Sequence, residues 1–123
     1  MTLNDYVVFI RRELHQIPET GFNCPLTSQF IKNQLIKIGI NEIHHTGHHS
    51  MVAVVKNGPG PITGLRADFD ALNIIEETDL PFSSKNVGKM HACGHDAHSA
   101  MLLATAKYLF EHKDQWSGTV KLI

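Results

Sequence analysis

The sequence lacks an excess of charge of either sign. Eleven lysines and arginines stand against twelve aspartates and glutamates, which gives a formal net charge of -1 in 123 residues. Proteins that bind nucleic acid or an anionic membrane through their charge carry a basic patch or a polybasic stretch, and the sequence has neither. No apolar run approaches the roughly 20 residues that a membrane-spanning helix requires. We therefore expect a protein that binds neither nucleic acid nor membranes.

Signals for export are also missing, and cysteine is scarce. The opening segment, MTLNDYVVFIRRELHQ, lacks the basic flank followed by an apolar block that marks a signal peptide. The two cysteines, Cys24 and Cys93, lie far apart, and a cytosolic setting disfavours a disulfide between them. We therefore expect a cytoplasmic protein. Its hydrophobic share of 42% and charged share of 19% are ordinary for a globular domain with a modest core.

Helical and strand patterns alternate along the chain. Apolar residues at helical spacing predict three helices, over residues 6–17, 26–38 and 97–113. Thr2 and Asp5 have the spacing of a capping box before the first helix, and Gly39 stands where glycine often ends a helix. Apolar and β-branched stretches predict four strands, over residues 40–44, 50–56, 62–67 and 119–123. The alternation predicts an α/β fold in which the first two helices cover the sheet.

The connections between these elements carry further expectations. Residues 57–61, Asn-Gly-Pro-Gly-Pro, are a strong turn signal and predict a hairpin between the strands at 50–56 and 62–67. Residues 71–92 lack a sustained period and are predicted to form a long loop with one short element. The sequence stops inside the last predicted strand, and natural domains rarely end on an apolar strand. We therefore expect a truncated domain whose exposed sheet edge promotes self-association.

The densest group of reactive side chains is MHACGHDAH, at residues 90–98. It supplies a thiol, three imidazoles and a carboxylate where a loop opens into a helix. The glycine between Cys93 and His95 lets the backbone bend so that both side chains can point at one ion. A thiolate with an imidazole suits zinc, and mixed sites with carboxylates also hold manganese, cobalt or nickel. The alternative is a buried cysteine near solvated histidines.

A second group, Asp68 and Asp70, follows the strand predicted at 62–67. Sites in open α/β sheets form at the C-terminal ends of strands, and residues two apart on a strand share a face. One of these acids could orient a ligand histidine or lie near a metal, or both could simply solvate a loop. Two other polar clusters are predicted to be exposed. They are the HHTGHH segment at 44–49, in a solvent loop, and Arg11–His15, on the solvated side of the first helix.

Three motifs together resemble a known family. They are RRELHQIPETGF at residues 11–22, GLRADFDAL at 64–72 and MHACGHDAHSAMLLATAKYL at 90–109. Their order and spacing resemble the metal-dependent amidohydrolases that include hippurate hydrolases, N-acyl-amino-acid amidohydrolases and auxin-conjugate hydrolases. The resemblance spans essentially the whole chain. It implies that residues 1–123 are the N-terminal portion of a three-layer, zinc-peptidase-like catalytic domain, without the rest of that domain and without the lid or dimerisation domain.

The same resemblance implies a metal site. Family members hold two divalent ions, which zinc, manganese, cobalt or nickel could supply, and Cys93 and His95 correspond by position to two of the ligands. Asp70 corresponds to the acid that supports the site and is the expected catalytic residue. Asp68 stands where related peptidases carry a ligand histidine. His98 is expected, with its neighbour Asp96, to support the ligands rather than to bind the ions.

The implied reaction is hydrolysis of the amide bond of an N-acyl amino acid. Water activated by two metals would attack the acyl carbonyl, and a glutamate would act as the base. In the family, that glutamate follows the strand that corresponds to residues 119–123, and further histidine ligands come later. We therefore expect little or no activity from this chain alone. Two alternatives stay open: a non-catalytic metal-binding or interaction module, and an enzyme that uses Cys93 as its nucleophile.

Overall fold

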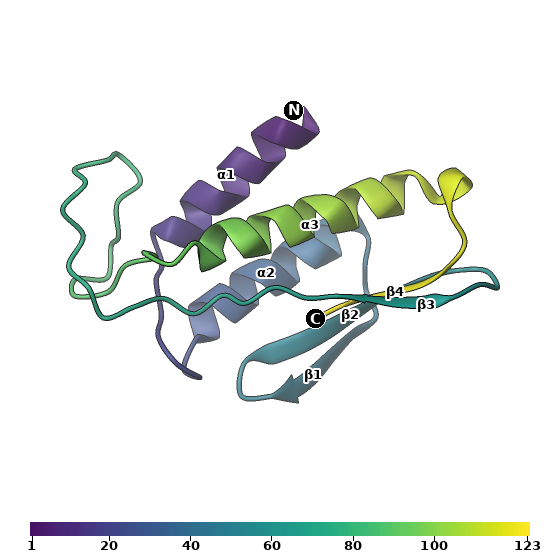
Figure 1. Ribbon diagram of the computed structural model, residues 1–123, viewed down its shortest axis with the longest axis horizontal. Helices are drawn as coiled ribbons and strands as arrows, with labels where there is room; N and C mark the ends of the chain where they lie inside the picture. The colour runs from purple at the N-terminus through teal and green to yellow at the C-terminus, as the bar shows by residue number, and fades with distance from the viewer.

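Two α-helices, α2 and α3, lie on one face of a four-stranded sheet, and a third, α1, packs on α3 (Figure 1). A computed structural model describes all of residues 1–123. The elements are α1 (Leu3–His15), α2 (Pro25–Ile38), β1 (Ile43–Gly47), β2 (Ser50–Asn57), β3 (Ile62–Leu65), α3 (His95–Glu111), the short 3-10 helix η1 (Lys113–Gln115) and β4 (Gly118–Leu122). The predicted helices and the last three predicted strands are confirmed, with small shifts at their ends. None of the helices has both the length and the apolar character that a bilayer-spanning helix needs.

Local signals set the start of α1. Thr2 and Asp5 form the predicted capping box. The Asp5 N–H donates to Thr2 Oγ1 at 3.1 Å, and the Thr2 N–H donates to Asp5 Oδ2 at 3.0 Å. These two bonds satisfy backbone donors that have no partner within the helix.

A glycine turn ends α2 and displaces β1. Gly39 has the left-handed φ of 113°, and both its N–H and the Ile40 N–H donate to the Leu35 carbonyl. A Cβ at Gly39 would lie 2.6 Å from the Phe110 ring, so the turn also permits close packing against α3. Ile40 is buried by this turn instead of entering the sheet, and β1 therefore begins at Ile43 rather than at residue 40.

The last strand in the sequence lies inside the sheet. The strand order is β1-β2-β4-β3; β2 is antiparallel to β1 and β4, and β4 is parallel to β3. The predicted hairpin between residues 50–56 and 62–67 is therefore wrong, because β4 separates the two strands. The turn after β2 passes closely over the start of β4. The Thr119 N–H donates to the Pro61 carbonyl at 3.0 Å, and a Cβ at Gly60 would lie 2.9 Å from the Gly118 Cα.

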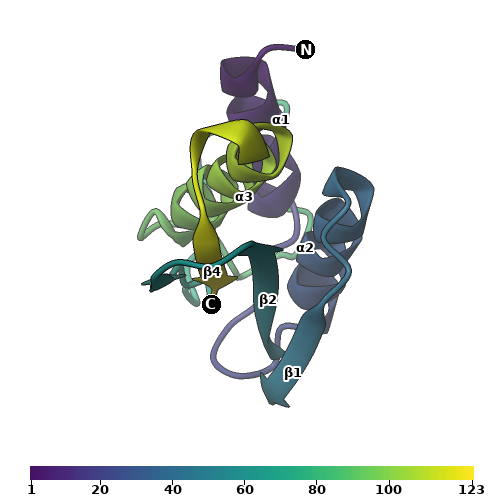
Figure 2. The same cartoon turned by 90° about the vertical axis from the view of Figure 1, so that its right-hand side faces the viewer.

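The helices cover the sheet unevenly (Figures 1 and 2). Val120 and Leu122 of β4 are buried in the core that the helices share, whereas Lys121 between them is exposed on the opposite face. α1 packs mainly against α3, and α2 packs beside β2. The expectation that the first two helices cover the sheet is thus corrected. α2 and α3 cover it, and α1 lies on α3.

The connection from β3 to α3 is a long loop, as predicted for residues 71–92, but it contains no helix or strand. Isolated bridges join Thr20 to Ala71 and Leu72 to Met90, in place of the expected short element. The two ends of the loop are therefore held close to each other and to the segment that follows α1.

Replacing Gly118 with alanine should destabilise the crossing between the turn and β4. Gly118 has a φ of 109°, and an added Cβ would meet the Pro61 carbonyl oxygen. Because left-handed strain and the clash add together, we expect the free energy of unfolding in urea to fall by at least about 2 kcal/mol. Gly64→Ala is the matched control, since its Cβ would make an ordinary 3.7 Å contact with Ile123. It should change stability by less than about 1 kcal/mol. Equal losses in both variants would contradict this account.

The carboxylate of Glu76 should make stability depend on acid pH. Burial tends to raise its pKa, but hydrogen bonds from the Thr78 hydroxyl, the Ser84 N–H and His15 outweigh burial and lower the pKa from 4.5 to about 2. A pKa that is lower in the folded state means that ionised Glu76 stabilises the fold above about pH 4.5, and that this contribution is lost as the pH falls toward 2. The stability advantage of the unmodified chain over Glu76→Gln should therefore shrink across this range in urea unfolding. A difference that is constant with pH would refute the assignment.

Candidate metal centre

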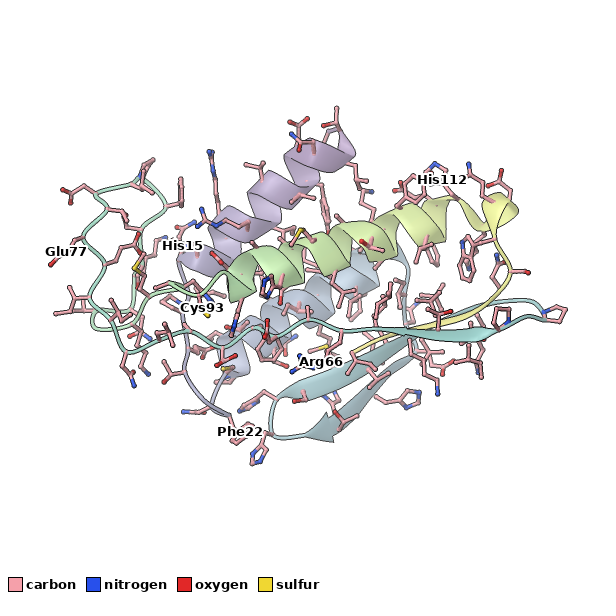
Figure 3. The ribbon with its side chains drawn as sticks, viewed as in Figure 1. His15, Phe22, Arg66, Glu77, Cys93 and His112 are labelled. Carbon is pink, nitrogen blue, oxygen red and sulfur yellow. The ribbon has the colours of Figure 1, made fainter.

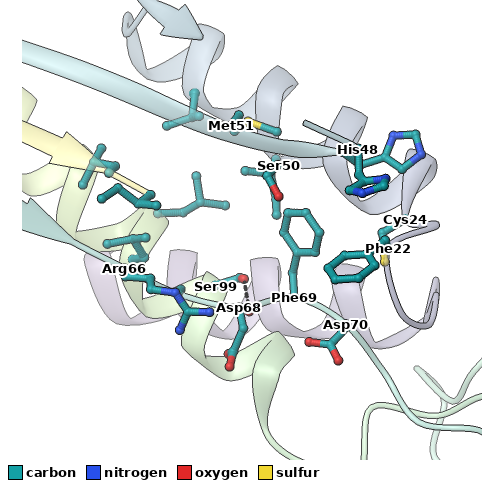
Figure 4. Close-up of a pocket in the computed structure, with 18 of the residues that line it drawn as sticks. Phe22, Cys24, His48, Ser50, Met51, Arg66, Asp68, Phe69, Asp70 and Ser99 are labelled. Carbon is teal, nitrogen blue, oxygen red and sulfur yellow. Dashed lines mark hydrogen bonds between the residues drawn. The ribbon is translucent and has the colours of Figure 1, made fainter. Parts of the chain in front are cut away.

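Asp68 and Asp70 lie where the chain leaves β3. Pairing with β4 continues past the strand, because the Ala67 N–H donates to the Ile123 carbonyl at 3.0 Å. Phe69 turns the opposite way and packs against the hydrophobic core. The two acids that flank it are half-buried and share the other side, as the strand pleat predicts (Figure 4).

His95 is the first residue of α3 and lies between the two acids. It follows Gly94, whose left-handed φ of 89° turns the chain into the helix. His95 Nδ1 is 2.9 Å from Asp70 Oδ1 and 3.0 Å from the Asp70 carbonyl oxygen, so these two acceptors require Nδ1 to carry the proton. His95 Nε2 points the other way and lies 3.4 Å from Asp68 Oδ2. A cation bound by both atoms would satisfy them, so these side chains fit a metal ion.

His98 lies one turn further along α3 and contacts the same carboxylate. Its Nδ1 is 2.9 Å from Asp68 Oδ1, and its ring stacks on that of His95 with centroids 5.5 Å apart. Ser99 Oγ donates to the Asp68 carbonyl oxygen at 2.8 Å. The hydrogen bond with His98 lowers the pKa of Asp68, and the charge of His95 adds to this effect while burial opposes it. Asp68 is therefore held as a carboxylate, the form that binds cations.

The structure brings Asp68, His95 and His98 together. One ligand atom from each lies within 4.8 Å of the others. His98 was expected only to support the ligands, but its position makes it a potential ligand as well. The spacing of His95 and His98, three residues apart on a helix, is the signal that could have indicated this. Cys93 is exposed in the turn before α3 and is not part of this group, so its pairing with His95 stays a prediction (Figure 3).

Known proteins with the same motifs identify the family. The model of Peptidase family M20/M25/M40 matches residues 64–123, which include all of these side chains. The IAA-amino acid hydrolase ILR1-like 5 of Arabidopsis thaliana is 44% identical over 119 residues, and the N-acyl-L-amino acid amidohydrolase of Geobacillus stearothermophilus is 42% identical over 118 residues. The chain belongs to the M20 family of peptidases and amidohydrolases. These two matches cover 97% and 95% of this M20 chain, which spans only 27% and 32% of the relatives.

Solved structures of similar proteins share the fold. An aminohydrolase from methicillin resistant Staphylococcus aureus matches with a TM-score of 0.90 at 39% identity. The YXEP protein of Bacillus subtilis, described as a dinuclear metal binding peptidase of the M20 family, matches with a TM-score of 0.90 at 37% identity. Each match covers 98% of this M20 chain, and the chain covers 32% and 34% of those structures. The predicted α/β class and its likeness to the N-terminal part of M20 structures are confirmed.

Asp96 of this M20 chain faces away from the metal group, toward α1. It is buried, and its Oδ2 lies 2.8 Å from His15 Nδ1 and accepts from Arg11 Nε at 3.0 Å. Its Oδ1 accepts from the Ala97 N–H at 2.9 Å, so Asp96 fastens the first turn of α3. The prediction that Arg11–His15 is the solvated side of a helix is wrong for His15, which is 1% exposed. His15 lies one helical turn after Arg11, and both face Asp96 on α3.

His91, the first histidine of the MHACGHDAH motif, is not part of the metal group either. It is 4% exposed, and its ring centroid lies 6.4 Å from that of His15. Burial lowers the pKa of His91, although the nearby Asp96 opposes this effect. The three histidines of the motif therefore divide into two groups. His95 and His98 lie beside the acids, and His91 lies in the interior.

A cavity of about 360 Å³ opens beside the acids, between α2, α3 and β2. Much of its wall is apolar, with Phe22, Met51 and Phe69 among the lining residues, and Asp68 and Asp70 also line it (Figure 4). An apolar cavity with a few polar groups is the usual form of a small-molecule site. The metal group therefore has space beside it for the apolar part of a ligand.

The segment HHTGHH lies in the exposed hairpin formed by β1 and β2. His44 and His45 belong to β1, so the predicted solvent loop is in part a strand, but both side chains are exposed as expected. His44 Nε2 lies 3.1 Å from Glu42 Oε2, and His45 Nε2 lies 3.2 Å from Lys32 Nζ. These surface contacts place the segment outside the metal group.

Proposed function

We propose that this chain is the N-terminal portion of the catalytic domain of an amidohydrolase that cleaves the amide bond of N-acyl amino acids with the help of two divalent ions. The observation that carries the proposal is the orientation of His95. Asp70 accepts a hydrogen bond from Nδ1, which directs Nε2 toward the Asp68 carboxylate, 3.4 Å away. The names of the relatives, which include an N-acyl-L-amino acid amidohydrolase and a dinuclear metal binding peptidase, support the substrate class and the number of ions.

Cys93 and His95 are the proposed ligands, with Asp68 and His98 as further potential donors. A thiolate, imidazoles and a carboxylate suit zinc, and also admit manganese, cobalt or nickel. Bound divalent ions would polarise the acyl carbonyl and lower the pKa of the attacking water. Asp70 holds the His95 ring and its tautomer, and this is the catalytic support that we assign to it.

The carboxylates that contact His95 belong to Asp68 and Asp70, and both are engaged with histidine nitrogens. The metal group itself therefore includes no free carboxylate that could accept a proton from water. The apolar cavity beside it supports an apolar acyl group, as in hippurate. We expect this chain to bind metal ions and to hydrolyse hippurate slowly or not at all.

Titration of the chain with Co²⁺ tests the ligand assignment. A thiolate-to-cobalt charge-transfer band should appear, and it should vanish in Cys93→Ala. His95→Ala should abolish tight binding, and Asp70→Asn should weaken binding by about 10–100-fold, as is usual when the partner of a ligand histidine is lost. The matched control is His44→Ala, because His44 is an exposed histidine in β1 and its loss should leave the affinity unchanged.

The same titration discriminates the alternatives. A charge-transfer band together with hippurate turnover that Cys93→Ala abolishes would contradict the expected inactivity of the chain. Rapid alkylation of Cys93 in the presence of Co²⁺, without the band, would instead favour a free cysteine nucleophile. Equal affinities for Co²⁺ in the parent chain and in His95→Ala would contradict the assignment of His95 as a metal ligand.

We also propose that the free edge of β3 promotes self-association. β3 pairs only with β4, and Ile62 on it is 69% exposed. Unpaired strand edges pair readily with other chains, and a lysine on the edge prevents this. Ile62→Lys should therefore shift the mass measured by light scattering toward the monomer at high concentration. Val87→Lys is the control, because Val87 is 92% exposed in the long loop. A monomeric parent chain at all concentrations would argue against the proposal.

A further inference from the structure

Several ionisable side chains are buried beside the start of α3 but take no part in the proposed chemistry. The side chains of His15, Glu76 and Asp96 are only 2%, 4% and 1% exposed. His15 lies between the other two: its Nδ1 is 2.8 Å from Asp96 Oδ2, and its Nε2 is 3.1 Å from Glu76 Oε2. Buried charges are costly unless they are paired, so these three groups have to be satisfied as a unit.

Both ring nitrogens of His15 face carboxylate oxygens, Nδ1 that of Asp96 and Nε2 that of Glu76. Arg11 binds the same oxygen of Asp96, and its Nε donates to Asp96 Oδ2 at 3.0 Å. The Phe82 ring packs against this network, with its centroid 5.8 Å from that of His15 and 5.5 Å from the Arg11 guanidinium carbon.

The Asp96 end of the network acts on the helix that carries His95. Asp96 directly follows His95, and its Oδ1 accepts from the Ala97 N–H at 2.9 Å. The residue before the helix is Gly94, which has no side chain that could cap it. The contact between His15 and Asp96 therefore fixes the first turn of α3 relative to α1.

The Glu76 end of the network acts on the loop that begins after Asp70. Glu76 accepts from the Ser84 N–H at 2.8 Å and from the Thr78 hydroxyl, so its carboxylate organises the loop around itself. Its contact with His15 then joins that loop to α1. His15 is thus the one side chain that links Asp96, beside His95, to Glu76, in the loop that follows Asp70.

We propose that His15 is a positioning residue for the metal site. Through Asp96 and Glu76 it holds the segments of His95 and Asp70 at the separation at which Nδ1 of His95 donates to Asp70. The inference rests on the proposed function, in which Nε2 of His95 binds a metal ion. A histidine with a purely structural role would change the stability of the chain and leave the tautomer of His95 unaltered.

Three substitutions separate the two contacts of His15. His15→Asn keeps an amide N–H near the position of Nδ1 and therefore keeps a donor for Asp96. His15→Gln extends an amide N–H toward Glu76, and His15→Leu removes both donors. The matched control is Ile10→Val, because Ile10 is fully buried in the core on the same helix and its loss of a methyl group weakens packing without altering the network.

The first measurement uses the chain without metal. Two-bond ¹⁵N–¹H NMR correlations of the imidazoles report which nitrogen of His95 carries the proton. We expect Nδ1–H in the parent chain and in Ile10→Val, and a mixture of tautomers in His15→Leu. His15→Asn should lie closer to the parent than His15→Leu does. An unchanged His95 spectrum in a folded His15→Leu variant would overturn the inference.

The second measurement is the affinity for Co²⁺ by titration calorimetry. Loss of the groups that orient ligand histidines weakens metal binding by about 10–100-fold, so we expect about a tenfold loss in His15→Leu and no change in Ile10→Val. If His15→Leu does not fold, Glu76→Gln carries both measurements, since its amide oxygen still accepts from the Ser84 N–H. Unchanged values in that variant would equally overturn the inference.

The two proposals fail in different ways. A parent chain that does not take up Co²⁺ would overturn the proposed function, and the role of His15 with it. A parent chain that binds Co²⁺, with an affinity and a His95 tautomer unaffected in the folded His15→Leu variant, would overturn the positioning role alone.

Discussion

The contact between His95 and Asp70 is the constraint on which the candidate site depends. An imidazole offers a lone pair to a metal only from the nitrogen that lacks a proton, and the proton stays on the other nitrogen when a fixed acceptor holds it. Asp70 supplies two such acceptors, its carboxylate and its carbonyl oxygen, at 2.9 Å and 3.0 Å from Nδ1. The two residues are 25 positions apart in the sequence, so the loop between them has to bring His95 back to Asp70, beside which the loop begins.

Packing elsewhere in the fold makes that return possible. Ala100, Leu103 and Ala104 of α3 are buried in the core that contains Val120 and Leu122 of β4, so the helix is held above the sheet along its middle turns. Its first turn then projects over the end of β3. β3 runs parallel to its neighbour β4, so the residues that follow β3, including Asp68 and Asp70, lie beneath the first turn of α3. The histidines of α3 and the acids after β3 meet because helix and sheet are already fixed.

Much of this could be predicted from local sequence. The capping box of Thr2 and Asp5 and the helix-ending glycine at position 39 depend only on residues close in sequence. The start of α1 and the end of α2 are therefore where the sequence predicts them. The shared face of Asp68 and Asp70 follows from the strand pleat alone. The predicted pairing of β2 with β3 is wrong because β4, which comes much later in the chain, takes the position beside β2. The turn between β2 and β3 carries no information about β4.

The burial of His15 could not be predicted for a related reason. A helix face with two arginines, a glutamate and a histidine is polar by composition, and only the position of Asp96 on another helix turns part of it into an interior network. Local polarity indicates a solvated surface unless a buried partner of opposite charge is known. Such partners are brought together only by the tertiary structure. The sequence separation of 81 residues between His15 and Asp96 does not indicate that the two side chains are in contact.

The first turn of α3 therefore serves two purposes at once. Successive residues on a helix point about 100° apart, so His95 and His98 share one side while Asp96 points to another. One side faces the acids of the candidate site, and the other faces the charged network under α1. A change at Asp96 acts on both, because that residue is joined to His95 by a peptide bond. His15 contacts Asp96 and Glu76 but none of the side chains of the candidate metal site. Substitutions at His15 can therefore change the buried network without removing a proposed metal ligand.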